Sequence, residues 1–332
     1  MTAPIETTSG QAEAQPEAIL GGMGRKTIEG RSLGQIAWMR FKRDKVAVAG
    51  GVVVILLVLL AILAKPIESI FGLDPNAFHQ DLVDPELLAP KGGWGGMSAD
   101  HPLGVDPQFG RDLLARTIEG SWISLVVATG ATILSNVIGT VLGIVAGYYG
   151  GWVDSVISRL MDTFLAFPLL LFAISISASL QDGAFGLEGL PLRICVLIFV
   201  IGFFNWPYMG RIVRGQTLSL REREFVEAAR SLGARGPFIL FRELLPNLVA
   251  PILVYSTLLI PTNILFEAAL SFLGVGIAPP QASWGNMLTS AVDVFQADPQ
   301  YMFVPGLAIF ITVLAFNLLG DGLRDALDPR SK

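Results

Sequence analysis

Cysteine, histidine and charged residues are all scarce in this chain of 332 residues. Its single cysteine, Cys195, lies inside an apolar run, so no disulfide can form within the chain. Two histidines, His79 and His101, are too few for a histidine-rich metal site or for a Ser-His-Asp or Cys-His catalytic arrangement. The sequence contains no G-x-x-x-x-G-K-[ST] phosphate loop. We therefore expect neither an enzyme nor a chain that binds its own cofactor or metal.

The shortage of charge indicates that lipid is the main solvent of this chain. Charged residues make up 15% of the sequence and hydrophobic residues 52%, and the mean hydropathy is +0.59. A soluble domain typically has about 25% charged residues. A helix needs about 20 apolar residues to cross a bilayer. Six stretches approach that length, at residues 46–64, 121–148, 163–180, 194–209, 248–273 and 304–319. We predict an all-α polytopic membrane protein with six transmembrane helices, the fourth interrupted near its end by Asn205 and Pro207.

The distribution of Lys and Arg predicts the orientation of these spans. Segments between successive spans lie alternately on the two sides of the membrane. Of the 23 basic residues, 18 lie in the segments on the side of the two termini, and five lie in the segments on the other side. The five are Lys65, Lys91, Arg111, Arg116 and Arg193. Cytoplasmic loops carry the excess of positive charge, so both termini are expected in the cytoplasm.

The segments outside the spans differ in character. Residues 1–30 are rich in Ala, Glu, Thr and Gly and are expected to form a disordered cytoplasmic tail. Residues 31–45 mix bases with apolar side chains, which suits either a helix on the inner membrane surface or a solvated basic leader that only sets topology. The outer segment 65–120 is net acidic and long enough to form a small cap. Residues 121–320 form the predicted core, and 321–332 a cytoplasmic tail.

The segment 210–247 interrupts the core with seven arginines, which exclude it from the bilayer. Ser219 and Glu222 have the spacing of a capping box. A predicted apolar stripe follows on one helix face, made of Phe225, Ala228, Ala229 and Leu232. Gly233 stands where a helix C-terminus favours a left-handed residue, Pro237 suits the first turn of a second helix, and Pro246 is expected to end that helix. We predict a short helix, a tight turn and a second short helix at the inner face.

Several polar and helix-bending residues lie within or near the spans. Glu267 and Asn263 are costly in lipid and are expected to face protein or a water path. Glu267 is interpreted either as a gating or path-lining group or as a carboxylate hydrogen-bonded to a loop. Pro168 and Pro261 predict kinks. Gly139, Gly143 and Gly147 recur every four residues and predict close helix packing.

The spacing of residues in the inner segment resembles the EAA loop of the membrane subunits of binding-protein-dependent ABC importers. The matching run is Glu227-Ala228-Ala229, three residues, Gly233, nine residues, and then Glu243-Leu244-Leu245-Pro246. The general pattern prefers Ile where this chain has Glu243. Stretches beginning at His101, Arg159, Glu267 and Gly320 resemble the second, C-type permease of the dipeptide, oligopeptide and nickel branch, and the likeness covers about residues 34–329.

This resemblance implies a type I ABC importer permease fold in a bacterial plasma (inner) membrane. The chain would pair with a sister permease as a heterodimer, with two cytoplasmic ATPases that use the ATP and Mg²⁺, and with an extracytoplasmic substrate-binding protein; no nucleic-acid partner is implied. The expected coupling residues are Glu224, Glu227, Ala228, Ala229, Arg230, Gly233, Arg235 and Pro246. Glu267, Asn263 and Pro261 are the expected path or gating residues.

The substrate and the class of transporter leave alternatives. Dipeptides or oligopeptides are the expected cargo, and nickel, haem and glutathione are handled by similar permeases. An ion-coupled secondary transporter would need several intramembrane acids and an internal repeat, whereas the sequence offers Glu267 and no clear repeat. A membrane enzyme would need catalytic residues, and a scaffold would not need a shaped helix–turn–helix at the inner face.

Overall fold

The computed structural model describes residues 33–86, 89–180, 183, 186–296 and 298–327. Within these ranges the chain is helical apart from loops and one pair of two-residue antiparallel strands, β1 (Val83–Asp84) and β2 (Ala89–Pro90). The predicted tail at residues 1–30 lies outside the described residues. The fold is therefore all-α, as the composition predicts.

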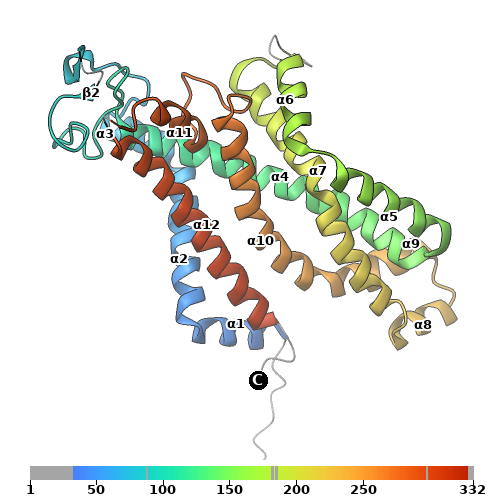
Figure 1. The fold of residues 1–332 in the computed structure, drawn as a ribbon. Helices are drawn as coiled ribbons and strands as arrows, with labels where there is room; N and C mark the ends of the chain where they lie inside the picture. The colour runs from blue at the N-terminus through green and yellow to red at the C-terminus, as the bar shows by residue number, and fades with distance from the viewer. Residues whose placement is uncertain (1–32, 87–88, 181–182, 184–185, 297, 328–332) are drawn as a thin grey trace, which may run out of the picture.

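Five helices are long and apolar enough to cross a membrane, counting only the described residues. They are α2 (Lys45–Ile62), α4 (Leu113–Tyr149), α7 (Gly189–Leu220), α10 (Leu245–Phe272) with the helical turns that precede it from Gly236, and α12 (Gln300–Leu327). Each contains most or all of one predicted span, and three of them extend well beyond it. The helices are longer than the apolar runs because their polar ends continue into the two caps of the molecule (Figure 1).

The predicted third span, residues 163–180, is wrong as a single helix. The chain forms α5 (Gly151–Ala166) and α6 (Leu169–Ser179), which are bent by 76° at a short break. Phe167 adopts an extended conformation with φ −79° and ψ 130°, because the proline that follows disfavours helical backbone at the residue before it. Pro168 therefore marks a break, and the bent pair supplies a sixth span only if both parts count as one.

The predicted end of the fourth span is also wrong. Asn205 and Pro207 do not interrupt α7, which continues to Leu220. Both residues are buried, and the Asn205 side-chain amide donates a 2.8 Å hydrogen bond to Asn263 Oδ1 of α10. Burial against a neighbouring helix and a satisfied side chain let α7 tolerate a proline that would break an isolated helix.

Glycines bring α4 and α7 into close contact, as their four-residue spacing predicts. A β-carbon on Gly139 would lie 2.7 Å from the Trp206 carbonyl oxygen, and one on Gly143 would lie 2.7 Å from the Gly210 carbonyl oxygen. One on Gly147 would lie 2.7 Å from Thr217 Cβ. These distances are below van der Waals contact, so any side chain at the three positions would force the helices apart.

The molecule has two distinct ends (Figure 1). At one end lie α3 (Ala64–Phe71), the 3-10 turn η2 (Gln80–Leu82), the strand pair and α11 (Trp284–Val292). At the other end lie α1 (Leu33–Arg43), α8 (Glu224–Ser231) and the last turns of α12. The basic segments gather at this second end, which the distribution of charge predicts to be the cytoplasmic one.

Helix α1 lies across the ends of α2 and α12 (Figure 1). Phe41 turns inward, with its ring 3.6 Å from the positions that β-carbons on Gly51 and Gly322 would occupy. Trp38 stacks on Phe41, with ring centres 5.9 Å apart, but is 57% exposed, and Lys42 Nζ lies 5.0 Å from the centre of its ring. Of the segment 31–45, the described part is helical over Leu33–Arg43 and exposes an aromatic ring beside a base.

Candidate coupling loop and buried polar seam

The inner loop begins with a helix start that differs from the predicted capping box. Ser219 lies inside α7, and Glu222 accepts a 2.8 Å hydrogen bond from Arg221 Nε. Helix α8 starts at Glu224, with Arg223 as its N-cap and no side-chain capping hydrogen bond. The capping-box interpretation is therefore wrong: α7 continues about three turns further than its apolar pattern indicates and takes Ser219 into its last turn. Glu224 and Glu227 in the first turn of α8 stabilise its start through the helix dipole.

The end of α8 agrees with the prediction for Gly233. This residue adopts φ +80°, a left-handed conformation that glycine reaches without steric cost. Its N–H donates to the Arg230 carbonyl, and the Ala234 N–H donates to the Ala229 carbonyl, at 2.9 and 3.0 Å. These two bonds form a Schellman motif, which ends the helix abruptly and fixes the direction of the chain.

Helix α8 buries a different face from the predicted stripe. Val226 and Ala229 are buried and pack in one cluster with Met209, Ile239 and Leu244 of the neighbouring segments. Ala228 is exposed, and Leu232 is 88% exposed. The predicted stripe is therefore only partly buried. The neighbouring helices contact α8 along the face of Val226, which is displaced by one residue from the face with the most apolar residues.

The outward face of α8 carries an apolar tip between charges. Glu224, Glu227 and Arg230 are exposed around Ala228 and Leu232. The Arg230 guanidinium carbon lies 5.3 Å from the ring centre of Tyr148, which holds the side chain over the last turn of α4. This arrangement is a small, preformed projection with an apolar centre and a charged rim.

A hollow of about 530 Å³ lies beside this projection. It is lined by Leu232, Gly233, Arg235, Phe238 and Glu243, together with Ala229 and Ala234. Apart from Ala229, these residues come from the turn and from the helical segment that follows α8. A projection with an adjacent hollow gives another protein surface two complementary features to contact.

The helix after the turn begins as predicted and then continues past its predicted end. Pro237 lies in the first turn of α9 (Gly236–Phe238), which runs into the π-helical segment η3 (Ile239–Leu244) and then α10. Pro246 does not end this helix, since it lies in the first turn of α10. A widened π-helical turn directly before a proline leaves room for its ring and removes the need for its missing N–H.

Hydrogen bonds and an ion pair attach the loop to the inner ends of three helices. The Arg221 guanidinium donates a 3.0 Å hydrogen bond to the Gly147 carbonyl at the end of α4. Arg214 of α7 forms a two-point ion pair with Asp154 of α5, with Nη2 and Oδ2 2.7 Å apart. These contacts connect the inner ends of α4, α5 and α7 next to α8.

The three residues expected at the path lie in the core instead of in an open cavity. Glu267 is fully buried, and its two carboxylate oxygens accept hydrogen bonds from Ser124 of α4 and Ser271 of α10 at 2.8 and 2.7 Å. Asn263 is also fully buried, and its amide donates to Thr132 Oγ1 of α4 at 2.8 Å. Pro261 is buried within α10.

These groups form a buried polar seam of α4, α7 and α10. It contains the Glu267–Ser124 bond, the Thr132–Asn263–Asn205 chain and, further along, the Asn136–Ser256 bond of 2.6 Å. Sequence reasoning singled out Glu267 and the asparagines but missed their hydroxyl partners. The available signal was that Ser124, Thr132 and Asn136 recur at multiples of four along α4.

Among the described residues, no group of three or more His, Cys, Asp and Glu side chains is arranged to hold a metal ion. His79 and His101 lie in the outer cap with ring centres 4.9 Å apart. His101 Nδ1 is 2.6 Å from Asp112 Oδ2, and Asp112 in turn caps the start of α4 by accepting from the Ala115 N–H. The two histidines therefore fasten the outer loop to α4.

The fold and the inner loop define a polytopic, non-catalytic permease subunit, and comparison with known proteins identifies the family. Residues 139–332 match the model of the binding-protein-dependent transport system inner membrane component, and residues 32–90 match the N-terminal TM domain of oligopeptide transport permease C. The chain belongs to this family of multi-pass inner-membrane ABC importer permeases.

Relatives agree with this assignment, and a solved structure shares the fold. The chain is 41% identical over 295 residues to the glutathione transport system permease protein GsiD of Pectobacterium atrosepticum, covering 89% of this chain and 90% of that one. It is 42% identical over the same length to GsiD of Escherichia coli O6:K15:H31, with the same coverage. An inward-facing structure of the MetNI methionine ABC transporter superposes with a TM-score of 0.50 at 19% identity, covering 64% of this chain and 96% of that chain.

Proposed function

We propose that this chain is one of two permease subunits through which an ATP-driven importer moves small peptides, glutathione among them. A substrate-binding protein on the outer face delivers the cargo, and two ATPase subunits on the inner face bind ATP and Mg²⁺. The oligopeptide-permease match of the N-terminal span and the names of the relatives support peptide-like cargo over nickel or haem.

The observation that carries the proposal is the preformed projection of α8. Protein interfaces concentrate their binding energy in a few apolar anchors that a charged rim surrounds. Leu232 is 88% exposed and supplies such an anchor, while Glu227 and Arg230 supply the rim. The Schellman turn at Gly233 holds the anchor in place before any partner binds, which lowers the entropy cost of docking.

Coupling follows from the attachments of α8. ATP-driven closure of the two ATPases moves this helix, and its links to α4, α5 and α7 carry the displacement into the spans. The transporter then shifts between inward-open and outward-open states because the nucleotide binds the two states with different affinity. The polar seam of Glu267, Asn263 and their partners closes the contact of α4, α7 and α10 in one of these states, and Pro261 gives α10 a point at which to bend.

A reconstituted complex tests this proposal. The chain is purified with its sister permease and ATPases, placed in liposomes with the binding protein, and assayed for ATP hydrolysis and for uptake of labelled glutathione and dipeptides. Ala228→Trp puts a bulky side chain on the exposed face of α8, so it should abolish both substrate-stimulated hydrolysis and uptake.

The control is Arg324→Trp, because Arg324 is equally exposed at the same end of the molecule but lies on α12, away from α8 (Figure 1). This variant should retain stimulation. Normal substrate-stimulated ATP hydrolysis and uptake in Ala228→Trp would show that α8 does not contact the ATPases. Uptake by this chain alone, driven by an ion gradient, would replace the importer proposal with a secondary transporter.

A further inference from the structure

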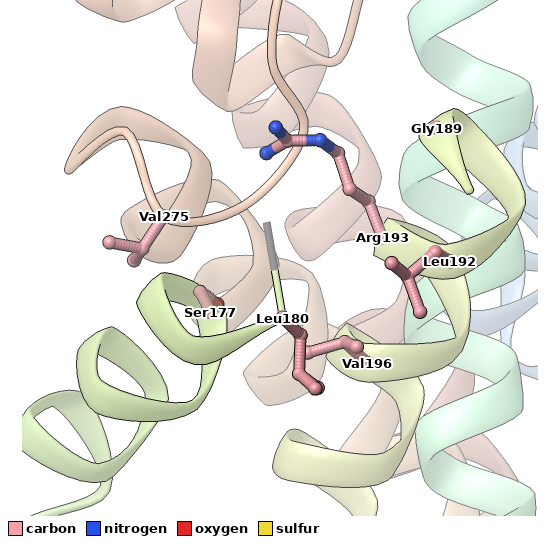
Figure 2. Close-up of a pocket in the computed structure, with 7 residues that line it drawn as sticks. All are labelled: Ser177, Leu180, Gly189, Leu192, Arg193, Val196 and Val275. Atoms are coloured by element: carbon pink, nitrogen blue, oxygen red, sulfur yellow. The ribbon is translucent and has the colours of Figure 1, made fainter. Parts of the chain in front are cut away.

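A small pocket of about 70 Å³ lies at the outer ends of α6 and α7, against the loop that follows α10 (Figure 2). Leu192, Arg193 and Val196 enter it from α7, and Ser177 and Leu180 from α6. Gly189 and Val275 complete the lining. Four lining side chains are aliphatic and Ser177 is polar, and among the described lining residues the full positive charge is on Arg193.

The Arg193 guanidinium is only partly engaged by the protein. It donates one 3.0 Å hydrogen bond, from Nη1 to the Gly276 carbonyl oxygen. Over the described residues no carboxylate forms an ion pair with it. A guanidinium has five N–H donors, and the hydrogen bond that Arg193 makes to the described residues uses one of them.

The other outer bases are used differently. Lys65 and Arg111 form ion pairs with Glu68 and Asp106. Lys91 and Arg116 donate to carbonyl oxygens of the outer cap and its loops, and Arg116 is 1% exposed. Arg193 therefore stands apart as an outer base on a transmembrane helix that lines a pocket.

The chemistry of the pocket selects a carboxylate. A planar guanidinium binds a carboxylate through two parallel hydrogen bonds, which add both strength and a fixed orientation. The Ser177 hydroxyl is a further group on the lining that can donate. The volume admits a carboxylate with a few attached atoms and not a whole peptide.

We propose that Arg193 binds a carboxylate of the incoming substrate at the outer end of the translocation path. This inference rests on the proposed function and names its substrate class: small peptides with a free terminal or side-chain carboxylate. Arg193 thereby favours such substrates over their neutral amides when the binding protein releases them.

The test compares a dipeptide with its C-terminal amide in the reconstituted complex at saturating binding protein. Arg193→Gln should reduce uptake of the free acid about tenfold, the size expected for a lost charged hydrogen bond, and leave uptake of the amide nearly unchanged. Arg193→Lys keeps the charge but lacks the planar guanidinium, so its uptake of the free acid should lie between those of the wild type and Arg193→Gln. Lys65→Gln removes an equal charge from the same face at an exposed position and should behave as wild type.

The readout is the ratio of acid to amide uptake, relative to wild type. Because the binding protein is the same in every assay, a change in this ratio belongs to the permease. An equal loss for both cargoes would show that Arg193 only holds the Gly276 loop, and an unchanged ratio would likewise overturn the proposal. If the wild-type complex imports no peptide, the proposed function is wrong. The proposal for Arg193 then holds only if the cargo that the complex does import carries a carboxylate and its uptake falls in Arg193→Gln.

Discussion

At the scale of single residues, the contact between α4 and α7 depends on missing β-carbons. In Gly143→Ala the new methyl group would meet the Gly210 carbonyl at 2.7 Å and Val213 Cβ at 2.9 Å. Forcing extra volume into such a contact costs about 1–3 kcal/mol. We expect a clearly lower thermal unfolding midpoint in detergent. Gly215→Ala on α7 is the matched control, since its β-carbon meets nothing within 4 Å. Equal midpoints for the two variants would contradict the close packing.

A second residue-scale prediction concerns Asp298 in the outer loop before α12. This side chain is 5% exposed, and its Oδ2 has no hydrogen-bond partner among the described residues. Burial raises the pKa of Asp298 above its ordinary value of 3.8. The folded protein thus holds this proton more tightly than the unfolded chain, so the stability contribution of Asp298 is present below pH 3.8 and is lost as pH rises through the raised pKa. Asp298→Asn should flatten the fall in the unfolding midpoint as pH rises above 3.8, and parallel curves for the variant and the wild type would refute the prediction.

At the scale of elements, the turn after α8 depends on one conformation. Gly233 has φ +80° and open space around its α-carbon, so Gly233→Ala adds no clash and only backbone strain of about 1–2 kcal/mol. We expect a severalfold loss of substrate-stimulated ATP hydrolysis with normal assembly of the complex. Gly233→Asn should recover part of it, because asparagine tolerates the left-handed region. Equal substrate-stimulated ATP hydrolysis in Gly233→Ala and Gly233→Asn would show that the left-handed turn does not position α8.

The same elements show which parts of the structure can be predicted from the sequence. Hydropathy predicts α2, α4, α7, α10 and α12, because lipid requires each span to satisfy its own backbone. It fails at Asn205 and Pro207, since α7 continues there by contact with Asn263, a residue 58 positions away. Local chemistry also favoured a cap at Ser219 and a stop at Pro246. Both were overridden by tertiary packing, which a single sequence does not reveal.

At the scale of the whole molecule, the buried polar seam and the inner loop were predictable from the sequence to different degrees. Spacing in the sequence predicts Gly233 and the exposed charges of α8, because caps are local. It does not predict which face of α8 is buried, or that Glu267 meets Ser124 across 143 positions. The size of the bend between α5 and α6 is equally beyond it, since a proline indicates that a helix breaks and not the angle at which it resumes.

The orientation of the molecule gives a final prediction, which single cysteines can test. In a Cys195→Ala background, cysteines are placed at Gly93 in the outer cap, at Ser231 on α8 and at Arg324 on α12, all exposed positions. The excess of Lys and Arg at the end with α1 and α8 predicts that this end is cytoplasmic. A membrane-impermeant maleimide should therefore label Gly93→Cys in intact cells, and Ser231→Cys and Arg324→Cys only after the membrane is opened. Three crossings separate Gly93 from α8 if the bent α5–α6 pair spans as one unit, and two if it does not. Labelling of Ser231→Cys and Arg324→Cys in intact cells, together with Gly93→Cys, would therefore show that this pair does not complete the sixth crossing.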